Sequence, residues 1–445
     1  MHFSRRTNWN TEESELAHAH RERMQAGLPI ADLTKSNPTR CGFEYPASLL
    51  DMLTDARALD YDPQPRGLLH AREAVCEYYA AHGVSLDPNQ IILTTSTSEA
   101  YSFLFRLLCD PGDEVVVLQP GYPLFDFLAD LDDVRLKAAP LVYENGWQID
   151  AEGIRRTIGP ETRAIIVVHP NNPTGHFAKP SEAAELAALC REFGLSLIVD
   201  EVFLDYGFGD YSSGGEAMSF ARGIEGVPIY IVSGLSKIAG LPQMKAAWIV
   251  SALSPVTGPE REQAPNDAPN DAPNDALARL EVIADTFLSM NAPVQWALPQ
   301  WLGGRAAIQE QIRRRTAANL AELDRGLAAV KLETAKLDAA EPDAAKRDAV
   351  KLEAVRLEAF RAVQRLKVEG GWYAVLRIPA IQPDEQTVLE LLERGVWVHP
   401  GYFFGMPESG WLLVSLLAPE AEFSNGVATM IDYLGTNHGR NVTGR

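Results

Sequence analysis

Short apolar runs rich in β-branched residues alternate with longer helical stretches between about residue 90 and residue 250. These runs are predicted strands, and they cover Ile91–Thr94, Glu114–Leu118, Ala164–Val168, Ser196–Val199, Pro228–Val232 and Ala246–Val250. Such alternation is typical of an α/β fold, in which helices cover both faces of a mostly parallel sheet. Ligands then bind beyond the carboxyl ends of the strands. We therefore expect the functional side chains in the loops that follow these runs.

The two ends of the chain have a different pattern of predicted elements from this central part. They contain shorter strands, such as Trp372–Leu376 and Trp397–His399. A chain of 445 residues is long enough for two hydrophobic cores. We predict a large domain over 46–290 with a seven-stranded sheet, and a smaller α+β domain formed by the terminal segments 1–45 and 291–445.

Two segments look inserted into this plan. Residues 264–275 read APND three times over, and a run so rich in Pro and Asp cannot bury apolar surface, so we expect an exposed loop there. Residues 329–362 carry AVKLE twice and AVRLE once in a stretch rich in Ala, Lys and Glu. That composition suits a solvated helix, and a partner-binding helix is the less favoured alternative.

The composition excludes several kinds of partner. A net charge of −20 disfavours nucleic acid and anionic membrane surfaces. No apolar run approaches the ~20 residues of a membrane helix, and the start MHFSRRTNWNTEESE lacks the apolar stretch of a signal peptide. The cysteines form no CxxC pair, which disfavours a zinc site or a disulfide framework; they are Cys41, Cys76, Cys109 and Cys190. We expect a cytoplasmic protein without a metal site.

Lys237 is the sharpest candidate for chemistry. It ends the segment SGLSK, which directly follows the predicted strand Pro228–Val232. Burial at such a strand end lowers the pKa of the amine and frees it to form an imine with an aldehyde cofactor. Alone, the pattern is weak, because a lysine after a strand is more often a solvated surface residue.

Three further loops support a cofactor site. Asp200 ends the strand SLIVD, where a carboxylate can pair with a protonated pyridine nitrogen or can simply be a loop carboxylate. Asn172, in HPNNPTG, could donate to a phenolate oxygen, although Asn, Pro and Gly also favour a plain rigid turn. Thr95–Ser98 joins a strand to a helix, and the N–H groups there make an anion site, although any helix N-cap looks similar.

The order and spacing of these elements resemble the fold-type-I enzymes that use pyridoxal 5'-phosphate (PLP), specifically the class I/II aminotransferases of the aspartate aminotransferase superfamily. The resemblance covers about Leu33 to Ala418, apart from the two inserts. It implies that Lys237 carries PLP as a Schiff base. The implied cofactor-binding residues are Ser96, Thr97, Ser98, Tyr122, Asn172, Asp200, Ser233 and Lys245, together with Tyr61, which would reach the phosphate of a neighbouring subunit. The resemblance therefore implies a homodimer with shared sites.

Two departures from the family pattern affect the cofactor site. Phe203 stands where the family usually has a tyrosine that donates to the ring oxygen. Either a neighbouring donor replaces that hydrogen bond, or the pKa of the imine rises because a phenolate with fewer donors is a better base for the imine proton. Lys245 stands where an arginine clamps the phosphate. A lysine keeps the charge but gives up the bidentate fork.

The third departure affects the substrate. Leu413, in GWLLVS, replaces the arginine of the family's G-x-x-R-x-S, which holds the substrate carboxylate. No Lys or Arg occurs between Glu408 and Ala418, so a shifted register does not restore it. Either other groups bind the carboxylate, or the substrate has none there. The candidate substrate contacts are Ser36, Asn37, Arg40 and Arg66.

We expect a PLP-dependent aminotransferase that works by a ping-pong mechanism. A small-molecule donor, an amino acid or amine, would give its amino group to a 2-oxo acid, with Lys237 as general acid and base. The same fold also supports lyase, decarboxylase, racemase and cyclase chemistry. A non-catalytic PLP-binding protein is a further alternative.

Overall fold

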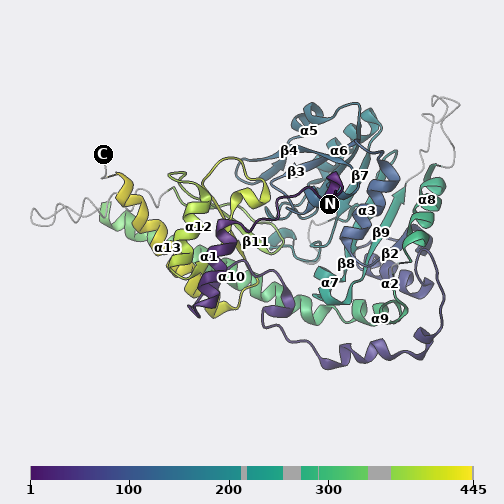
Figure 1. The fold of residues 1–445 in the computed structure, drawn as a ribbon, viewed down its shortest axis with the longest axis horizontal. Coiled ribbons are helices and arrows are strands. Elements are labelled where there is room, and N and C mark those ends of the chain that lie inside the picture. Colours follow the sequence, from purple (N-terminus) through teal and green to yellow (C-terminus); the bar gives the residue numbers. More distant parts are fainter. Residues whose placement is uncertain (1, 212–217, 254–271, 289, 339–361, 443–445) are drawn as a thin grey trace, which may run out of the picture.

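The computed structural model describes residues 2–211, 218–253, 272–288, 290–338 and 362–442 (Figure 1). Its largest feature is an eight-stranded sheet with the strand order β2-β9-β8-β7-β6-β3-β4-β5. The strands are β2 (Ile91–Thr94), β3 (Glu114–Gln119), β4 (Arg135–Tyr143), β5 (Trp147–Ile149), β6 (Thr162–Val168), β7 (Ser196–Asp200), β8 (Pro228–Gly234) and β9 (Ala247–Leu253).

The predicted count of seven strands is corrected to eight. After β4 the chain turns back and β5 pairs antiparallel with it, with Leu141 opposite Ile149. β5 has only three residues, which is too short to show an alternating pattern in the sequence. The sheet is otherwise mostly parallel, as predicted.

Strand direction brings several strand ends to one edge of this sheet. β3, β4, β6, β7 and β8 run parallel to their neighbours in that group. β9 lies antiparallel between β8 and β2, so β2 runs in the same direction as β8. The carboxyl ends of β2, β6, β7 and β8 therefore share one edge with the start of β9.

Helices cover both faces of the sheet. Alternate residues of β6 point to opposite sides: Ile165 and Val167 belong to one hydrophobic cluster, and Ala164 and Ile166 to the other. The first cluster packs under α2 (Leu69–Ala80), α6 (Pro180–Phe193) and α9 (Ala292–Gly303), with α5 (Ala151–Thr157) near the sheet edge. The second packs under α3 (Thr97–Leu108), α4 (Phe125–Leu131) and α8 (Ala272–Phe287).

A second, antiparallel sheet is built from the C-terminal part of the chain. Its strand order is β10 (Gln364–Arg365), β11 (Tyr373–Arg377), β14 (Trp411–Ser415) and β13 (His399–Pro400). Its core includes side chains of α10 (Ala306–Asp338), α12 (Asp384–Glu393) and α13 (Glu420–Val442).

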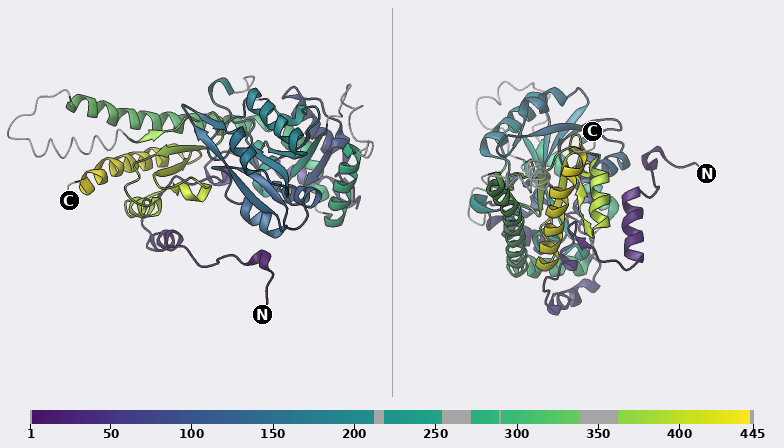
Figure 2. Two further views of the ribbon diagram at one scale, coloured as in Figure 1. Left: turned by 90° about the horizontal axis from the view of Figure 1, so that it is seen from above. Right: turned by 90° about the vertical axis from the view of Figure 1, so that its left-hand side faces the viewer.

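The N-terminal segment lies against this C-terminal part. β1 (Ala31–Asp32) pairs in parallel with β12 (Val396–Trp397). α1 (Glu15–Gln25) packs against α12 (Figures 1 and 2). Segments from both ends of the chain are thus side by side, while the domain boundaries at 45 and 290 stay a prediction.

The two inserted segments fall partly outside the described residues. Of the APND segment, 264–271 lies outside, whereas Ala272–Asp275 begin α8 instead of forming a loop. Asp275 pairs with Arg279 one turn later, at 2.8 Å, which favours the helix. Residues 329–338 continue α10, and 339–361 lie outside. Within the described residues, no helix is both long and apolar enough to span a membrane.

Candidate active site

Four of the predicted site residues meet at the shared edge of the large sheet. Asp200 is the last residue of β7, Ser233 is the last but one of β8, and Lys237 lies in the short helix α7 (Leu235–Ile238) that follows directly. Asn172 follows β6, the next strand in the sheet. Because β6, β7 and β8 are adjacent and parallel, these side chains come from neighbouring strand ends.

Lys237 lies in an aromatic environment. Its Nζ is 4.8 Å from the ring centroid of Trp372 and 5.6 Å from that of Phe203. Burial lowers the pKa of the Lys237 amine to about 8, although the carboxylate of Asp200 opposes this shift. Tyr206 Oη donates to the Lys237 carbonyl at 2.6 Å, which ties α7 to the loop after β7. A larger fraction of the amine is therefore neutral near pH 7 than in an exposed lysine.

Asp200 is a buried carboxylate with two donors. Val202 N donates to its Oδ1 at 3.0 Å, and Tyr101 Oη donates to its Oδ2 at 3.1 Å. Burial raises the pKa of Asp200 to about 6, while these two hydrogen bonds act in the opposite direction. The carboxylate is thus held in one orientation in a place where its charge is costly without a cationic partner. A protonated ring nitrogen would be such a partner.

The N-terminus of α3 lies at the same edge. Ser96 caps the helix, with Glu99 N donating to its Oγ at 3.1 Å. Thr97 and Ser98 occupy the first two helical positions, where backbone N–H groups have no acceptor within the helix. Tyr101, one turn later, reaches Asp200 and so places this terminus beside the β7 end. The arrangement suits an anion such as a phosphate.

Three buried polar atoms at this site have no hydrogen-bond partner among the described residues. They are Asn172 Oδ1, Ser233 Oγ and Trp372 Nε1. Buried polar atoms in native proteins are nearly always hydrogen-bonded. An amine, a buried carboxylate, a helix N-terminus and three unsatisfied polar groups fit PLP, which has an aldehyde, a ring nitrogen, a phenolic oxygen and a phosphate.

Two other predicted cofactor residues lie at or near the site. Tyr122 is partly buried, and burial together with the charge of Asp200 raises the pKa of its hydroxyl to about 12. Its ring meets that of Phe125 edge-on at 5.4 Å. Lys245 lies exposed, two residues before β9 starts at this edge.

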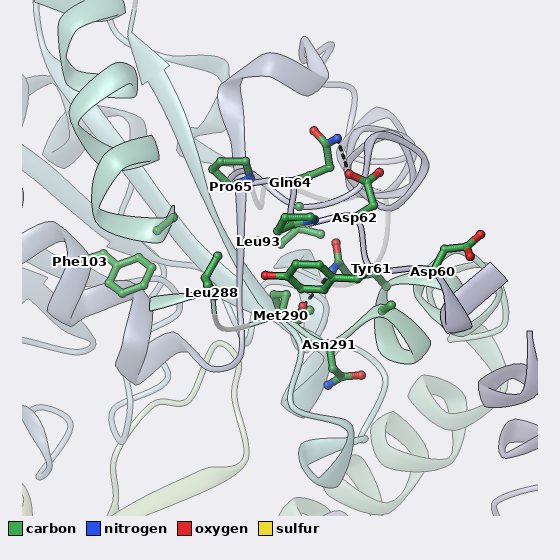
Figure 3. Close-up of a pocket in the computed structure, with 15 residues that line it drawn as sticks. Asp60, Tyr61, Asp62, Gln64, Pro65, Leu93, Phe103, Leu288, Met290 and Asn291 are labelled. Carbon is green, nitrogen blue, oxygen red and sulfur yellow. Dashed lines mark hydrogen bonds between the residues drawn. The ribbon is translucent and has the colours of Figure 1, made fainter. Parts of the chain in front are cut away.

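Tyr61 is placed differently from the other predicted residues. Its side chain is 80% exposed, and it lines a cavity of 220 Å³ together with Asp62, Gln64, Leu288 and Asn291 (Figure 3). Lys237 is not among the residues that line this cavity. Tyr61 therefore does not complete the site of its own chain, and its exposure suits contact with another molecule.

The position expected to bind a substrate carboxylate holds no charge. Leu413 is fully buried in β14, between Val375 of β11 and His399 of β13. Burial lowers the pKa of His399 to about 4, so its imidazole is neutral at physiological pH. The polar strand neighbour therefore does not replace the missing arginine.

The candidate substrate residues differ in whether their side chains already have partners within the protein. Arg66 already donates to Glu281 Oε2 at 2.7 and 2.9 Å and to the Asn89 carbonyl at 3.0 Å. Asn37 caps the turn Pro38–Arg40 through a bond from Thr39 N, and Ser36 lies close enough to Tyr373 to oppose the rise that burial causes in the pKa of the tyrosine hydroxyl. Arg40 is exposed and makes no ion pair within the described part of the chain.

Sequence reasoning missed three residues that shape this site, namely Tyr101, Tyr206 and Trp372. Tyr101 had one available signal, because it lies one helical turn after the predicted anion loop and so on the same helix face. Trp372 had none, since its contact with Lys237 depends on how the second sheet packs against the first. Tyr206 had none either, since its bond to the Lys237 carbonyl depends on the path of the loop after β7.

The fold and site together define an α/β enzyme with a buried lysine and carboxylate at the carboxyl edge of its main sheet. Residues 50–428 match the family model "Aminotransferase class I and II". The chain belongs to this family.

Similar proteins carry several activities in their names. The alanine aminotransferase of Mycobacterium bovis is 26% identical over 432 residues, 94% of this chain and 88% of that one. The glutamate-pyruvate aminotransferase AlaA of Escherichia coli is 26% identical over 290 residues, covering 65% of this chain and 67% of that one. An S-alkyl-thiohydroximate lyase of Arabidopsis thaliana is 30% identical over 213 residues, which is 47% of this chain and less than half (45%) of that protein.

Among solved structures, an aspartate aminotransferase mutant of Thermus thermophilus matches with a TM-score of 0.76. The match has 22% identity and covers 97% of this chain and all of that one. At this identity the likeness shows the fold, which confirms the predicted α/β architecture with a second, smaller sheet.

Proposed function

We propose that this protein is a PLP-dependent aminotransferase that moves an amino group from an amino acid or amine to a 2-oxo acid. The observation that carries the proposal is the pair formed by Lys237 and Asp200. Burial lowers the pKa of the lysine to about 8 and raises that of the carboxyl to about 6. Opposite perturbations of two titratable groups at one strand edge are typical of a catalytic site.

Each residue of the site has a distinct task in this proposal. PLP, when bound, supplies an electron sink for the bonds at the substrate carbon next to the nitrogen. Lys237 would offer the amine for the covalent link and, when free, would move the proton at that carbon. Asp200, oriented by Tyr101, would keep the ring nitrogen protonated. The α3 terminus, Ser233 and Lys245 would hold the phosphate, and Tyr122 would contact the ring.

The substrate side of the proposal rests on Leu413. An arginine–carboxylate bond contributes ~1.5–3 kcal/mol, and Leu413 cannot supply it. Arg40 is our candidate for binding a substrate carboxylate, because Arg66 is already paired with Glu281. If Arg40 does not bind it, the preferred donor is an amine without a carboxylate at that position.

A half-reaction experiment tests the proposed function. The purified protein is loaded with PLP and mixed with amino acids and amines one at a time, while its absorption spectrum and the released product are recorded. We expect conversion to the amino form of the cofactor with release of an oxo acid or aldehyde, and recovery on addition of 2-oxoglutarate or pyruvate. Release of ammonia without that conversion would instead identify a lyase.

The control is Lys237→Ala. This variant should lose the visible band of the linked cofactor and the half-reaction together. Retention of transamination by Lys237→Ala would contradict the assigned role of the lysine.

A further inference from the structure

A bound PLP would lack one hydrogen bond at its phenolic oxygen. Phe203 follows Asp200 by three residues and is 4% exposed, so its side chain lies inside the site. A phenylalanine ring has no donor to offer. Buried oxygen atoms with a partial or full negative charge are strongly stabilised by donors, so a neighbouring donor would have a clear role here.

Trp372 supplies a buried donor at this place. Its ring packs edge-on against Phe203, with centroids 5.2 Å apart and planes at 77°. Lys237 Nζ lies over the face of the same indole, 4.8 Å from its centre. The side chain is 1% exposed, and Nε1 has no acceptor among the described residues. A buried indole N–H usually has a partner, so this one is left for a ligand.

The loop that carries Trp372 is fixed from both sides. Gly371 N donates to the Tyr206 carbonyl at 2.9 Å, and Phe208 N donates to the Glu369 carbonyl at 2.7 Å. On the side of the second sheet, Leu416 N donates to the Trp372 carbonyl at 2.7 Å. The ring of Tyr206 packs against the indole at 5.1 Å. The indole therefore has little freedom to turn its N–H toward another acceptor.

We propose that Trp372 Nε1 donates a hydrogen bond to the phenolic oxygen of bound PLP and so replaces the donor that Phe203 lacks. The inference rests on the proposed function, because it requires PLP linked to Lys237. Trp372 is then a cofactor-binding residue that comes from the second sheet, whereas Lys237, Asp200 and Asn172 come from the first.

The experiment is a pH titration of the visible absorbance of the PLP-loaded protein. A donor to the phenolic oxygen makes that oxygen a poorer base for the proton of the Lys237–PLP linkage. Trp372→Phe should therefore raise the pKa of this linkage by about one unit or more, the size expected for a lost bond to a charged oxygen. Its affinity for PLP should also fall by about tenfold.

Phe203→Tyr provides the complementary variant. In the Trp372→Phe background it should bring the pKa of the linkage back toward the wild-type value. In the wild type it should change the pKa less, because Trp372 already donates; this non-additivity is the signature of a shared acceptor.

Trp147→Phe is the matched control. Trp147 Nε1 is also buried without a partner, but it lies on β5 at the far end of the sheet order from β8. This variant should leave the pKa of the linkage unchanged. An equal pKa in Trp372→Phe and Trp147→Phe would overturn the inference and leave the proposed function standing.

Two further results distinguish failure of the proposed function from failure of the inference about Trp372. If the wild type forms no visible band with PLP, or if Lys237→Ala keeps it, the proposed function fails and this inference fails with it. If Trp372→Phe does not fold, a crystal structure of the PLP-loaded wild type decides. We expect Nε1 within hydrogen-bond distance of the phenolic oxygen, and a separation beyond about 3.5 Å would refute the bond.

Discussion

Asp200 makes the cofactor-free protein less stable as the pH rises. Its pKa is about 6 in the folded chain, against an ordinary value of 3.8. The group therefore contributes nothing unfavourable below about pH 3.8; its cost grows as the pH rises from about 3.8 to about 6, where the unfolded chain ionises and the folded chain does not, and it is complete above 6. The full loss in the free energy of unfolding is about 3 kcal/mol, because each pKa unit corresponds to about 1.4 kcal/mol.

The variant Asp200→Asn should reveal this cost. We would measure the free energy of unfolding by urea for the cofactor-free proteins at about pH 4.5 and about pH 7.5. Between these two pH values it should fall by about 2 kcal/mol more in the wild type than in the variant. The comparison cancels the contributions of other titrating groups, such as the buried His169. An identical pH dependence in both proteins would show that the pKa of Asp200 is not raised.

Tyr101 positions Asp200, and removing its hydroxyl should weaken cofactor binding. A hydrogen bond to a charged group contributes ~1.5–3 kcal/mol, so Tyr101→Phe should lower the affinity for PLP by about tenfold or more, measured by titrating cofactor-free protein. Tyr230→Phe is the control, because Tyr230 is buried in the same hydrophobic cluster but lies on β8 and makes no bond to Asp200. Equal losses in both variants would indicate a general packing effect.

At the residue scale, motifs located the proposed cofactor contacts but not the side chains that orient them. Lys237, Asp200 and Asn172 each lie at or just after the end of a strand in a recognisable segment, so the sequence alone was enough to bring them together. Trp372 was out of reach, because its role depends on a contact between distant segments of the chain, whereas Tyr101 had a signal only in its position one turn after the predicted anion loop. The sequence also could not predict that Arg66 is already paired with Glu281, because the two residues are 215 positions apart in the chain.

At the scale of elements, the loop after β6 carries a testable requirement for glycine. Gly175 has φ of +72°, and a Cβ at this position would lie 2.4 Å from the Gly370 carbonyl oxygen. The loop also closes on itself, with Gly175 N donating to the Asn171 carbonyl at 2.8 Å. A side chain here must push apart the two loops that carry Asn172 and Trp372.

Gly175→Ala should therefore lower both stability and PLP affinity. We expect a loss of about 2 kcal/mol or more in the free energy of unfolding by urea. Gly194→Ala is the control: its φ is +67°, but nothing lies within 4 Å of an added Cβ, so it should cost about 1 kcal/mol and leave PLP affinity unchanged. If the two variants behaved alike, the close approach would have no energetic role.

The strands of the main sheet were predictable in so far as they are continuously buried. β6 and β7 contain continuous apolar runs, Ala164–Val168 and Leu197–Val199, as parallel central strands usually do, and their predicted positions agree with the structure to within two residues. β4 was missed because it is mostly exposed and interrupted by charge, and β5 because it is too short. The start of α8 within the APND repeats was missed because composition predicts solvent exposure but not backbone conformation.

At the scale of the whole molecule, the exposure of Tyr61 leads to a prediction about assembly. If Tyr61 completes the site of a second copy, Lys237→Ala and Tyr61→Ala should each be poorly active alone. A refolded mixture should regain about a quarter of wild-type activity, because random pairing gives half heterodimers and each has one intact site of two.

Activity assays after co-refolding, with light scattering to follow the mass, test this arrangement. Each variant refolded with itself under the same conditions is the control and should regain nothing. A dimer whose mixture stays inactive would show that Tyr61 does not contribute to a neighbouring site.

The bonds of Glu369 and Gly371 to the first sheet have a mechanical consequence. Glu369 also accepts from Phe177 N at 3.1 Å and pairs with Lys179 and with Lys367. If substrate binding rotates the second sheet toward the first, this attachment lies on or near the rotation axis. The displacement of each residue would then grow with its distance from Glu369. Trp372 would therefore keep its place beside the cofactor, while the outer strands of the second sheet and the helices packed on them would move further. Amide hydrogen exchange, slow around 369–372 with and without substrate, would trace that axis.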